Sequence, residues 1–306
     1  MTGSSATGSA TGPVRVRVPA SSANLGPGYD ALGLALGHHD LLTAEVVDGP
    51  APVILVEGEG ANEVPLDSGH LVHRAMSRGF AELGLAVPPV RLHCVNAIPH
   101  GRGMGSSSAA IVGGLAVARA LAGPAGEALT DDRLFEIGAE LEGHPDNVAA
   151  AVHGGLTIGW TEGGRARAVR LDVTAAVTPV LLVPPDPLAT TVARRLLPPM
   201  VPHEDAAFSA GRAALLVAAL ASGAHALLEA TEDRLHQRYR APAMPRSAAL
   251  VQELRDLRIP AVISGAGPTV LALPEPARVA EVTARTPSGW RALDPGVDPG
   301  GVAHLT

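Results

Sequence analysis

The sequence of 306 residues contains no lysine, so all 23 of its Lys and Arg residues are arginines. This absence excludes the phosphate-binding lysine of a Walker motif, the strand lysine of protein kinases and a Schiff base to a cofactor aldehyde. Aromatic residues are also scarce, with three Phe, two Trp and two Tyr, although 46% of the residues are hydrophobic. We therefore expect a globular chain whose core is built from Ala, Val and Leu.

Cysteine and basic charge are limited as well. The single cysteine, Cys94, excludes an internal disulfide and a paired-cysteine zinc site, and its neighbours in VRLHCVN predict a core residue rather than a nucleophile. The net charge of −7 argues against a nucleic-acid partner. The densest apolar run, AALLVAALA at 213–221, is shorter than the roughly 18 residues of a membrane span. These features predict a cytoplasmic protein without a membrane partner.

The patterning of the chain predicts an α+β protein with two domains. The leader, residues 1–13, is small, polar and uncharged, lacks the features of a secretory signal and is expected to be disordered. The glycine-containing segment TEGGRAR marks the predicted boundary, which gives domains over 14–165 and 166–306. Strands are predicted over 14–18, 41–47, 52–58, 90–96, 155–160 and 179–183, with a strand–turn–strand unit over 261–273 and a weak terminal strand. Helices are predicted over 70–83, 106–123, 131–142, 205–221, 224–235, 247–257 and 276–284.

The most informative segment is PHGRGMGSSSAA at 99–110, in which Gly101, Gly103 and Gly105 precede a helix capped by serines. Glycine lets the backbone approach a bulky anion, successive amide N–H groups can donate to its oxygens, and a helix N-terminus adds partial positive charge. The serine hydroxyls could help to coordinate Mg²⁺, which prefers oxygen ligands. The segment fits a phosphate site as well as an ordinary glycine turn, and it matches neither the Rossmann nor the Walker pattern.

A second group of polar residues lies between two apolar helices and consists of Glu140, Glu142, His144, Asp146 and Asn147. A magnesium phosphate centre needs a carboxylate, and an alcohol nucleophile needs an acceptor that orients it or takes its proton. The group could supply both. A solvated helix end with an aspartate cap would explain the same pattern without any site.

Two further segments are rich in turn formers. PASSANLGPGYD, at 19–30, follows the first predicted strand and is expected to lack regular structure. Asn24 and Asp30 are its candidates for binding a substrate, unless the segment is a plain loop. SGAGPT, at 264–269, either reverses the chain between two strands or presents backbone amides to a ligand.

Together, and in this order, the four segments resemble the signature of the GHMP small-molecule kinase family. The runs at 19–30 and 140–147 are similar to its homoserine kinase branch, and the resemblance extends from about Val14 to the end of the sequence. It implies a two-domain GHMP kinase fold, with a ribosomal protein S5 domain 2-like N-terminal domain, a ferredoxin-like C-terminal domain and a homodimer. It also implies transfer of the γ-phosphoryl group of ATP, with Mg²⁺, to the side-chain hydroxyl of L-homoserine, which gives O-phosphohomoserine on the route to threonine.

The same resemblance assigns roles by matching positions. It implies ATP binding by Pro99, Gly101, Gly103, Met104, Gly105, Ser106, Ser107 and Ser108, and magnesium binding by Ser107 and Glu140. It implies substrate binding by Asn24, Asp30, Arg194, Arg240, Gly265 and Gly267, and catalytic roles for Asp146 and His144 near the reacting hydroxyl. The aspartate would hold the ammonium of the amino acid, and the two arginines would receive its carboxylate through paired donors.

Several alternatives stay open at this stage. Glu142 competes with Glu140 as the metal ligand, Arg195 and Arg238 compete with the two chosen arginines, and Asp146 either takes the hydroxyl proton or only orients the alcohol. A GHMP kinase that acts on a mevalonate-like acid or a sugar would have no ammonium for an aspartate to hold. A non-catalytic ligand sensor would have no reason to keep metal and hydroxyl partners together.

Overall fold

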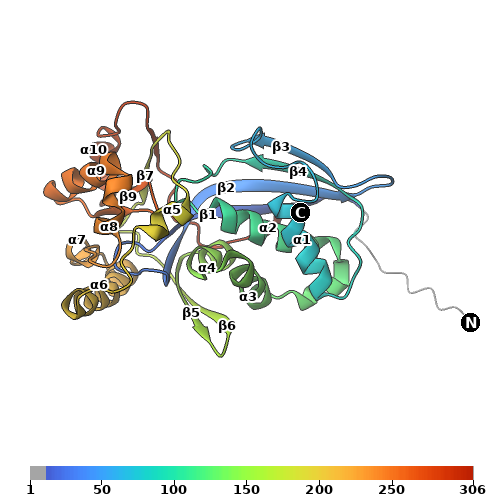
Figure 1. Ribbon diagram of the computed structural model, residues 1–306, viewed down its shortest axis with the longest axis horizontal. Coiled ribbons are helices and arrows are strands. Elements are labelled where there is room, and N and C mark those ends of the chain that lie inside the picture. The colour runs from blue at the N-terminus through green and yellow to red at the C-terminus, as the bar shows by residue number, and fades with distance from the viewer. Residues whose placement is uncertain (1–11, 306) are drawn as a thin grey trace, which may run out of the picture.

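The computed structural model describes residues 12–305, so the predicted disordered leader lies almost wholly outside the described residues. Two β-sheets organise the chain, one in each half of the molecule (Figure 1). The first is seven-stranded, with the order β11-β1-β2-β4-β3, β5 paired to β2 and β6 paired to β5. Its strands are β1 (Val14–Ala23), β2 (Leu32–Val46), β3 (Val53–Gly58), β4 (Val90–Asn96), β5 (Leu156–Glu162), β6 (Arg165–Leu171) and β11 (Ala303–Leu305).

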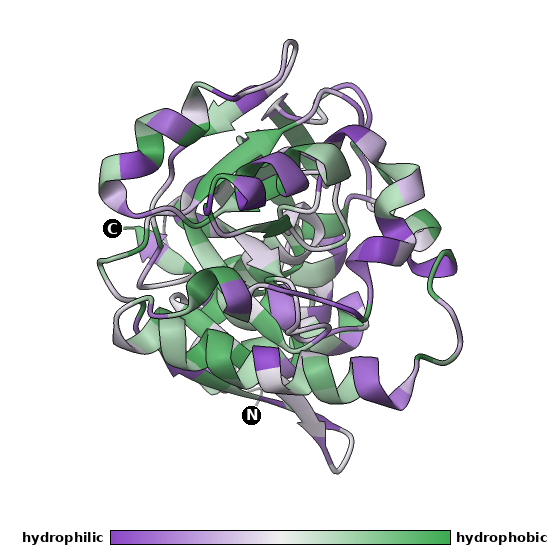
Figure 2. Ribbon diagram, turned by 90° about the vertical axis from the view of Figure 1, so that its left-hand side faces the viewer, coloured by the Kyte–Doolittle hydropathy of each residue, from purple (hydrophilic) through white to green (hydrophobic). Residues whose placement is uncertain are grey.

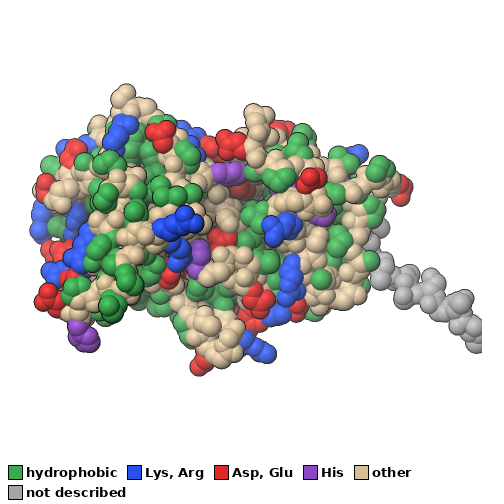
Figure 3. All heavy atoms as spheres, viewed as in Figure 1, with side chains coloured by type: hydrophobic (Ala, Val, Ile, Leu, Met, Phe, Trp, Pro, Cys, Tyr) green, Lys and Arg blue, Asp and Glu red, His purple; other side chains and the backbone are tan. Residues whose placement is uncertain are grey.

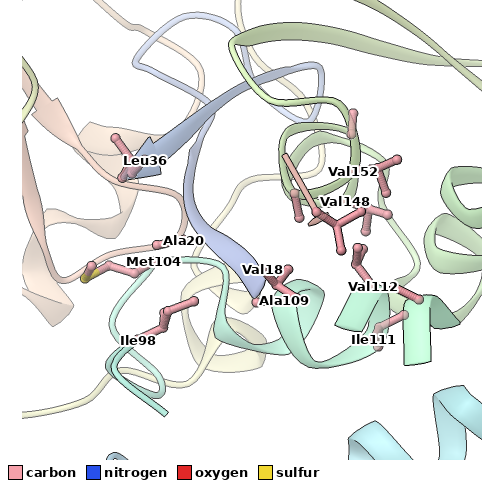
Figure 4. Packing of buried hydrophobic residues seen from close by; sticks show 14 of the residues in the cluster. Val18, Ala20, Leu36, Ile98, Met104, Ala109, Ile111, Val112, Val148 and Val152 are labelled. Carbon is pink, nitrogen blue, oxygen red and sulfur yellow. The ribbon is translucent and has the colours of Figure 1, made fainter. Parts of the chain in front are cut away.

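Helices cover one face of this sheet (Figure 1). They are α1 (Leu71–Glu82), α2 (Ser106–Leu121), α3 (Asp131–Glu142) and α4 (Asp146–His153). The backbones of α1 and α2 approach closely, because a Cβ on Gly114 would lie only 2.3 Å from the carbonyl oxygen of Val72. Figure 4 shows the aliphatic packing between β1, α2 and α4, where Val18, Val112 and Val148 meet. The predicted aliphatic core is confirmed.

The second sheet has the order β10-β7-β9-β8. Its strands are β7 (Val180–Val183), β8 (Ala261–Ile263), β9 (Val270–Ala272) and β10 (Arg291–Leu293). Around it lie α5 (Thr190–Arg195), α6 (His203–Ser222), α7 (Leu227–Ala230), α8 (Gln237–Arg240), α9 (Pro245–Asp256) and α10 (Val279–Thr283). Seen from this end of the molecule, the strands are mostly hydrophobic, whereas the surrounding helices carry many hydrophilic residues (Figure 2).

Helix α6 is long and apolar enough, by length and composition, to cross a membrane. In the fold, Leu216, Ala219 and Leu220 of this helix are buried in the larger hydrophobic core. Near its N-terminus the carboxylate of Asp205 is also buried and accepts a hydrogen bond from Arg238. One face of α6 is therefore used for packing within the protein.

Two segments differ from what the sequence predicts. The predicted domain boundary near residue 165 lies in the turn of the β5–β6 hairpin, because a glycine-rich turn and a linker have the same composition. Both hairpin strands belong to the first sheet, and the chain leaves that sheet only after Leu171. The segment at 19–30 is also not entirely irregular, since β1 continues to Ala23 and pairs there with Gly33 of β2.

The helix predicted over 224–235 is much shorter in the structure, where only α7 (Leu227–Ala230) is helical. The carboxylate of Asp233 explains the interruption, because it accepts hydrogen bonds from the backbone N–H groups of Leu235, His236 and Gln237. These bonds begin a new helix instead of continuing the old one. Cys94 is fully buried as predicted, and burial, with the charge of Asp40, raises the pKa of its thiol to about 12.

Candidate active site

The four segments that the sequence analysis selected meet at one cleft of about 170 Å³. Of the predicted site residues, the cleft is lined by Asn24, Asp30, Gly101, Gly103, Met104, Gly105, Ser106, Ser107, His144, Asp146, Arg194 and Arg240. Pro99, Ser108, Glu140, Gly265 and Gly267 do not line it. Acidic and basic side chains are interspersed on the molecular face drawn in Figure 3, without a continuous basic area there.

The glycine loop adopts the left-handed backbone for which its glycines are suited. Gly101, Gly103 and Gly105 have φ values of 65°, 70° and 71°. Gly105, rather than one of the predicted serine caps, is the N-cap of α2, and no side chain caps this helix. The backbone N–H groups of the first turn, from Ser106 onward, have no acceptor within the helix and can donate to an anion in the cleft.

The loop packs so tightly against its neighbours that side chains would not fit. A Cβ on Gly105 would lie 2.1 Å from Ser21 Oγ, and one on Gly103 would lie 2.2 Å from the carbonyl oxygen of Ser264. Ser264 Oγ donates to the carbonyl oxygen of Gly103 at 2.6 Å. The 264–269 turn therefore packs against the glycine loop and supports it, and Ala266, which was not predicted, is the residue of this turn that lines the cleft.

Glu142, and not Glu140, faces the serines of α2. Its carboxylate accepts hydrogen bonds from Ser107 Oγ at 2.6 Å and from Ser108 Oγ at 3.0 Å. Glu140 is turned away, with its side chain 56% exposed and its carboxylate 3.6 Å from Arg78. Two residues along an α-helix correspond to a rotation of about 200°, so both glutamates cannot face the same cleft. Of the two glutamates that the sequence left open as the metal ligand, Glu142 therefore lines the cleft, whereas the predicted Glu140 does not.

His144 and Asp146 form a pair beside this carboxylate. His144 Nδ1 lies 2.7 Å from Asp146 Oδ1, and His144 Nε2 lies 3.8 Å from Glu142 Oε1. Burial lowers the pKa of His144, but the hydrogen bond to Asp146 and the charges of both carboxylates outweigh this effect and raise the pKa above its usual value. Asp146 Oδ1 also accepts the backbone N–H of Asn147 at 2.8 Å. Its Oδ2 makes no hydrogen bond within residues 12–305 and is available to a substrate hydroxyl.

Asp30 and Arg194 form an ion pair in the same cleft. The guanidinium of Arg194 donates two hydrogen bonds to the Asp30 carboxylate, at 3.0 and 3.1 Å. Asp30 has a φ of 53°, and its backbone N–H donates to Asn24 Oδ1 at 3.0 Å. Asn24 in turn donates to the carbonyl oxygen of Gly265 at 2.7 Å. Asn24 therefore holds the loop that presents Asp30.

Arg240 is the second arginine of the cleft and is only 2% exposed. Burial lowers the pKa of its guanidinium, because the surroundings solvate the charge less well than water does. The competing arginines lie elsewhere. Arg195 is exposed on α5, and Arg238 pairs at the surface with Asp205 and Tyr239.

A second cavity, of about 270 Å³, adjoins the cleft and shares Ser106 and Ser107 with it. Its lining is mainly apolar, with polar groups at His70 and Asn96 among others. This cavity was not predicted from the sequence, because the glycine-serine motif supplies only one side of it and the rest comes from β2, β4, α1 and the 64–70 segment. Its position next to the first turn of α2 makes it accessible to a ligand whose anionic end occupies the cleft.

Family models and known proteins agree with this geometry. The models of the GHMP kinases N terminal domain and the GHMP kinases C terminal domain match residues 70–155 and 213–291. The chain is also 52% identical to a homoserine kinase from Streptomyces avermitilis over 95% of this chain and 95% of the relative. The chain belongs to the GHMP kinase family, in its homoserine kinase branch. A homoserine kinase from Clavibacter michiganensis subsp. michiganensis is 49% identical over 93% of this GHMP kinase and 92% of that protein.

Solved structures show the same fold. The crystal structure of homoserine kinase from Cytophaga hutchinsonii matches with a TM-score of 0.85 and 22% identity, and the match covers 100% of this GHMP kinase and 99% of that chain. A mevalonate diphosphate decarboxylase from Staphylococcus aureus matches with a TM-score of 0.70 and 15% identity, covering 96% and 98% of the two chains. The fold thus serves different reactions, and the predicted two-domain GHMP kinase fold is confirmed.

Proposed function

We propose that this GHMP kinase is a homoserine kinase, which transfers the γ-phosphoryl group of ATP to the side-chain hydroxyl of L-homoserine. The observation that carries the proposal is that Asp30, Arg194 and Arg240 line the same cleft as Asp146. One carboxylate and two guanidinium groups complement the ammonium and carboxylate of an amino acid. The free oxygen of Asp146 lies in the same cleft, where the side-chain hydroxyl would meet it.

ATP would occupy both cavities. Its phosphates would lie against the backbone N–H groups of Gly105 to Ser108, where the N-terminus of α2 adds partial positive charge. Its base would lie in the adjoining, mainly apolar cavity of about 270 Å³. Because the chain has no lysine, backbone amides take the role that a cationic side chain has in other kinases.

The residues around Ser107 fit a magnesium ion. Its hydroxyl and the Glu142 carboxylate lie 2.6 Å apart and both line the cleft, so two hard oxygen donors are adjacent. No cluster of three His, Cys, Asp or Glu side chains that could hold a metal occurs within residues 12–305. Such an ion would therefore share its coordination with phosphate oxygens and water, and it would offset charge on the transferred group.

The protein's part in the transfer is to position and polarise the hydroxyl. Asp146 Oδ2 would accept the hydrogen bond of the alcohol, while His144 and the Asn147 backbone hold Oδ1 in place. The raised pKa of His144 favours its charged form, in which Nδ1 donates to Asp146 Oδ1 and holds that carboxylate in place. An orienting role for Asp146 therefore fits the contacts better than obligatory proton removal. If turnover of Asp146→Asn falls by only a few-fold, an essential base is ruled out, since general-base help is worth roughly 10²- to 10⁴-fold.

The alternatives explain less of the cleft. A mevalonate-like acid or a sugar offers no ammonium for Asp30, and a ligand sensor has no use for the ordered contacts among Ser107, Glu142, His144 and Asp146. ADP release measured with ATP, Mg²⁺ and homoserine, serine, mevalonate or galactose separates these possibilities. Activity on homoserine alone is the expected result, and silence on all four substrates would favour a sensor.

The two glutamates of α3 provide a matched test of the metal site. Glu142→Gln is expected to raise the Mg²⁺ concentration needed for half-maximal activity at least tenfold, because it removes the carboxylate beside Ser107. Glu140→Gln lies two residues away on the exposed face of the same helix and is expected to stay within about twofold. Equal magnesium dependence in both variants would contradict the assignment.

Three wider expectations belong to the same proposal. The product, O-phosphohomoserine, would serve threonine biosynthesis, the enzyme would act in the cytoplasm, and it would form a homodimer. They are supported by relatives of about 50% sequence identity that are named homoserine kinases. Sedimentation velocity of the purified protein tests the dimer directly.

A further inference from the structure

His236 does not line the cleft, but it joins two parts of its wall. It precedes α8 and is 0% exposed. Its Nε2 lies 2.8 Å from the carbonyl oxygen of Gly26, and its Nδ1 lies 3.1 Å from Arg240 Nη1. A carbonyl can only accept and a guanidinium can only donate, so Nε2 carries the proton and Nδ1 accepts. The two neighbours thus select one neutral tautomer of the ring.

These contacts belong to a closed circle of contacts that joins the two halves of the molecule. Arg240 Nη1 also lies 3.4 Å from the carbonyl oxygen of Gly265, which accepts a hydrogen bond from Asn24 at 2.7 Å. The backbone from Asn24 through Leu25 to Gly26 closes this circle of contacts. Asn24 has a left-handed φ of 67°, a conformation that needs support from its surroundings in a non-glycine residue.

The surroundings of His236 disfavour the charged form of its imidazole. Burial lowers the pKa of His236, and the positive charge of Arg240 lowers it further, although Asp233 and Asp30 act in the opposite direction. The ring of Tyr29 packs against it with centroids 5.3 Å apart. A second proton would have to sit on Nδ1, facing the guanidinium.

We propose that His236 is a positioning residue for substrate recognition, an inference that rests on the proposed homoserine kinase function. By accepting from Nη1, it fixes the rotation of the Arg240 guanidinium. Nη2, which makes no hydrogen bond to the described part of the chain, is left to receive the α-carboxylate of the amino acid. By donating to Gly26, it also holds the 24–30 loop, so that Asp30 and Arg240 keep their positions relative to each other in the cleft.

The test compares His236→Leu, which removes both contacts, with His236→Gln, whose amide can donate to Gly26 and accept from Arg240. His236→Leu is expected to raise KM for homoserine by about 10- to 100-fold, the range of a lost hydrogen bond to a charged group. KM for ATP is expected to stay within about threefold, and His236→Gln is expected to recover most of the homoserine affinity. In an Arg240→Met background, His236→Leu is expected to add little, because the group that it positions is gone.

His153→Leu is the control, since His153 is a partly buried histidine that does not line the cleft and packs edge-on against Phe135 at the C-terminal end of α4. If His236→Leu does not fold, His236→Asn replaces it, because the shorter amide can accept from Arg240 but is too short to reach Gly26. An unchanged KM for homoserine, or equal increases of KM for homoserine and ATP, would overturn the inference while the enzyme remains a homoserine kinase. Absence of homoserine phosphorylation by the unmodified protein would overturn the proposed function and this inference with it.

Discussion

Gly105→Ala tests whether close packing of the glycine loop positions the phosphates. The added Cβ would lie 2.1 Å from Ser21 Oγ, whereas ordinary contacts begin at 3.4 Å. The loop or its neighbour must therefore move by about 1.3 Å, the difference of these distances. Separately, the φ of 71° at Gly105 costs an L-residue about 1–2 kcal/mol.

The two effects are separable by a control at Gly84. This residue has a φ of 67°, but a Cβ there would meet nothing within 4 Å, and it lies beyond the C-terminus of α1. Gly84→Ala should therefore lower the free energy of unfolding by only the about 1–2 kcal/mol that the left-handed backbone costs, with unchanged turnover. Gly105→Ala should lose at least as much stability and also about 100-fold in kcat/KM for ATP, because a displacement near 1 Å of a positioning group costs about that factor.

Urea unfolding and steady-state kinetics of the two variants measure both quantities. Ser21→Gly in the Gly105→Ala background removes the clashing hydroxyl. It is expected to restore part of the activity but not the stability that the left-handed backbone at residue 105 costs. Our explanation of the loop would be refuted if Gly105→Ala and Gly84→Ala kept the same kcat/KM for ATP while losing similar stability. The glycine would then serve the backbone conformation alone.

Two further predictions concern buried groups. Burial raises the pKa of Asp40 from 3.8 to about 6, even though its carboxylate accepts hydrogen bonds from the backbone N–H groups of Ala97 and Ile98. The folded protein therefore holds this proton more tightly than the unfolded chain does. The resulting stabilisation of the fold is complete well below pH 3.8 and is lost as the pH rises through 6. Relative to Asp40→Asn, the unfolding free energy of the unmodified protein should fall by about 2 kcal/mol between pH 4 and pH 7, and a constant difference in urea titrations would contradict this. Cys94, whose buried thiol has its pKa raised to about 12, should resist iodoacetamide at pH 8 until the protein is unfolded, and rapid alkylation of the native protein would contradict its burial.

Local signals in the sequence predicted much of the fold. The helix over 131–142 was predicted at its observed bounds, because Thr130 Oγ1 caps it at one end and Gly143, with a φ of 87°, ends it at the other. Long-range pairing explains the failures. The β5–β6 hairpin is recognisable as part of the first sheet only through the pairing of β5 with β2, more than a hundred residues away in the sequence.

In the candidate site, too, local signals were predictable from the sequence and long-range packing was not. The four motifs predicted many of the residues that meet in the cleft, since each motif carries its own polar groups, whereas Arg194 and Arg240 were predicted only from the family resemblance. The choice between Glu140 and Glu142 depended on the rotation of α3, which the pattern of its apolar residues could have indicated. The adjoining cavity and the role of His236 could not be predicted, because both depend on which segments distant in the sequence pack against the motifs.

The pairing of β11 with β1 has a consequence for how the protein is made. The strand Ala303–Leu305 follows the entire second sheet in the sequence, yet it occupies the edge of the first. Topologically, the second domain is an insertion within the first. On the ribosome, the first domain therefore cannot complete its edge when its early strands emerge, and that edge remains open until synthesis has passed through the inserted domain.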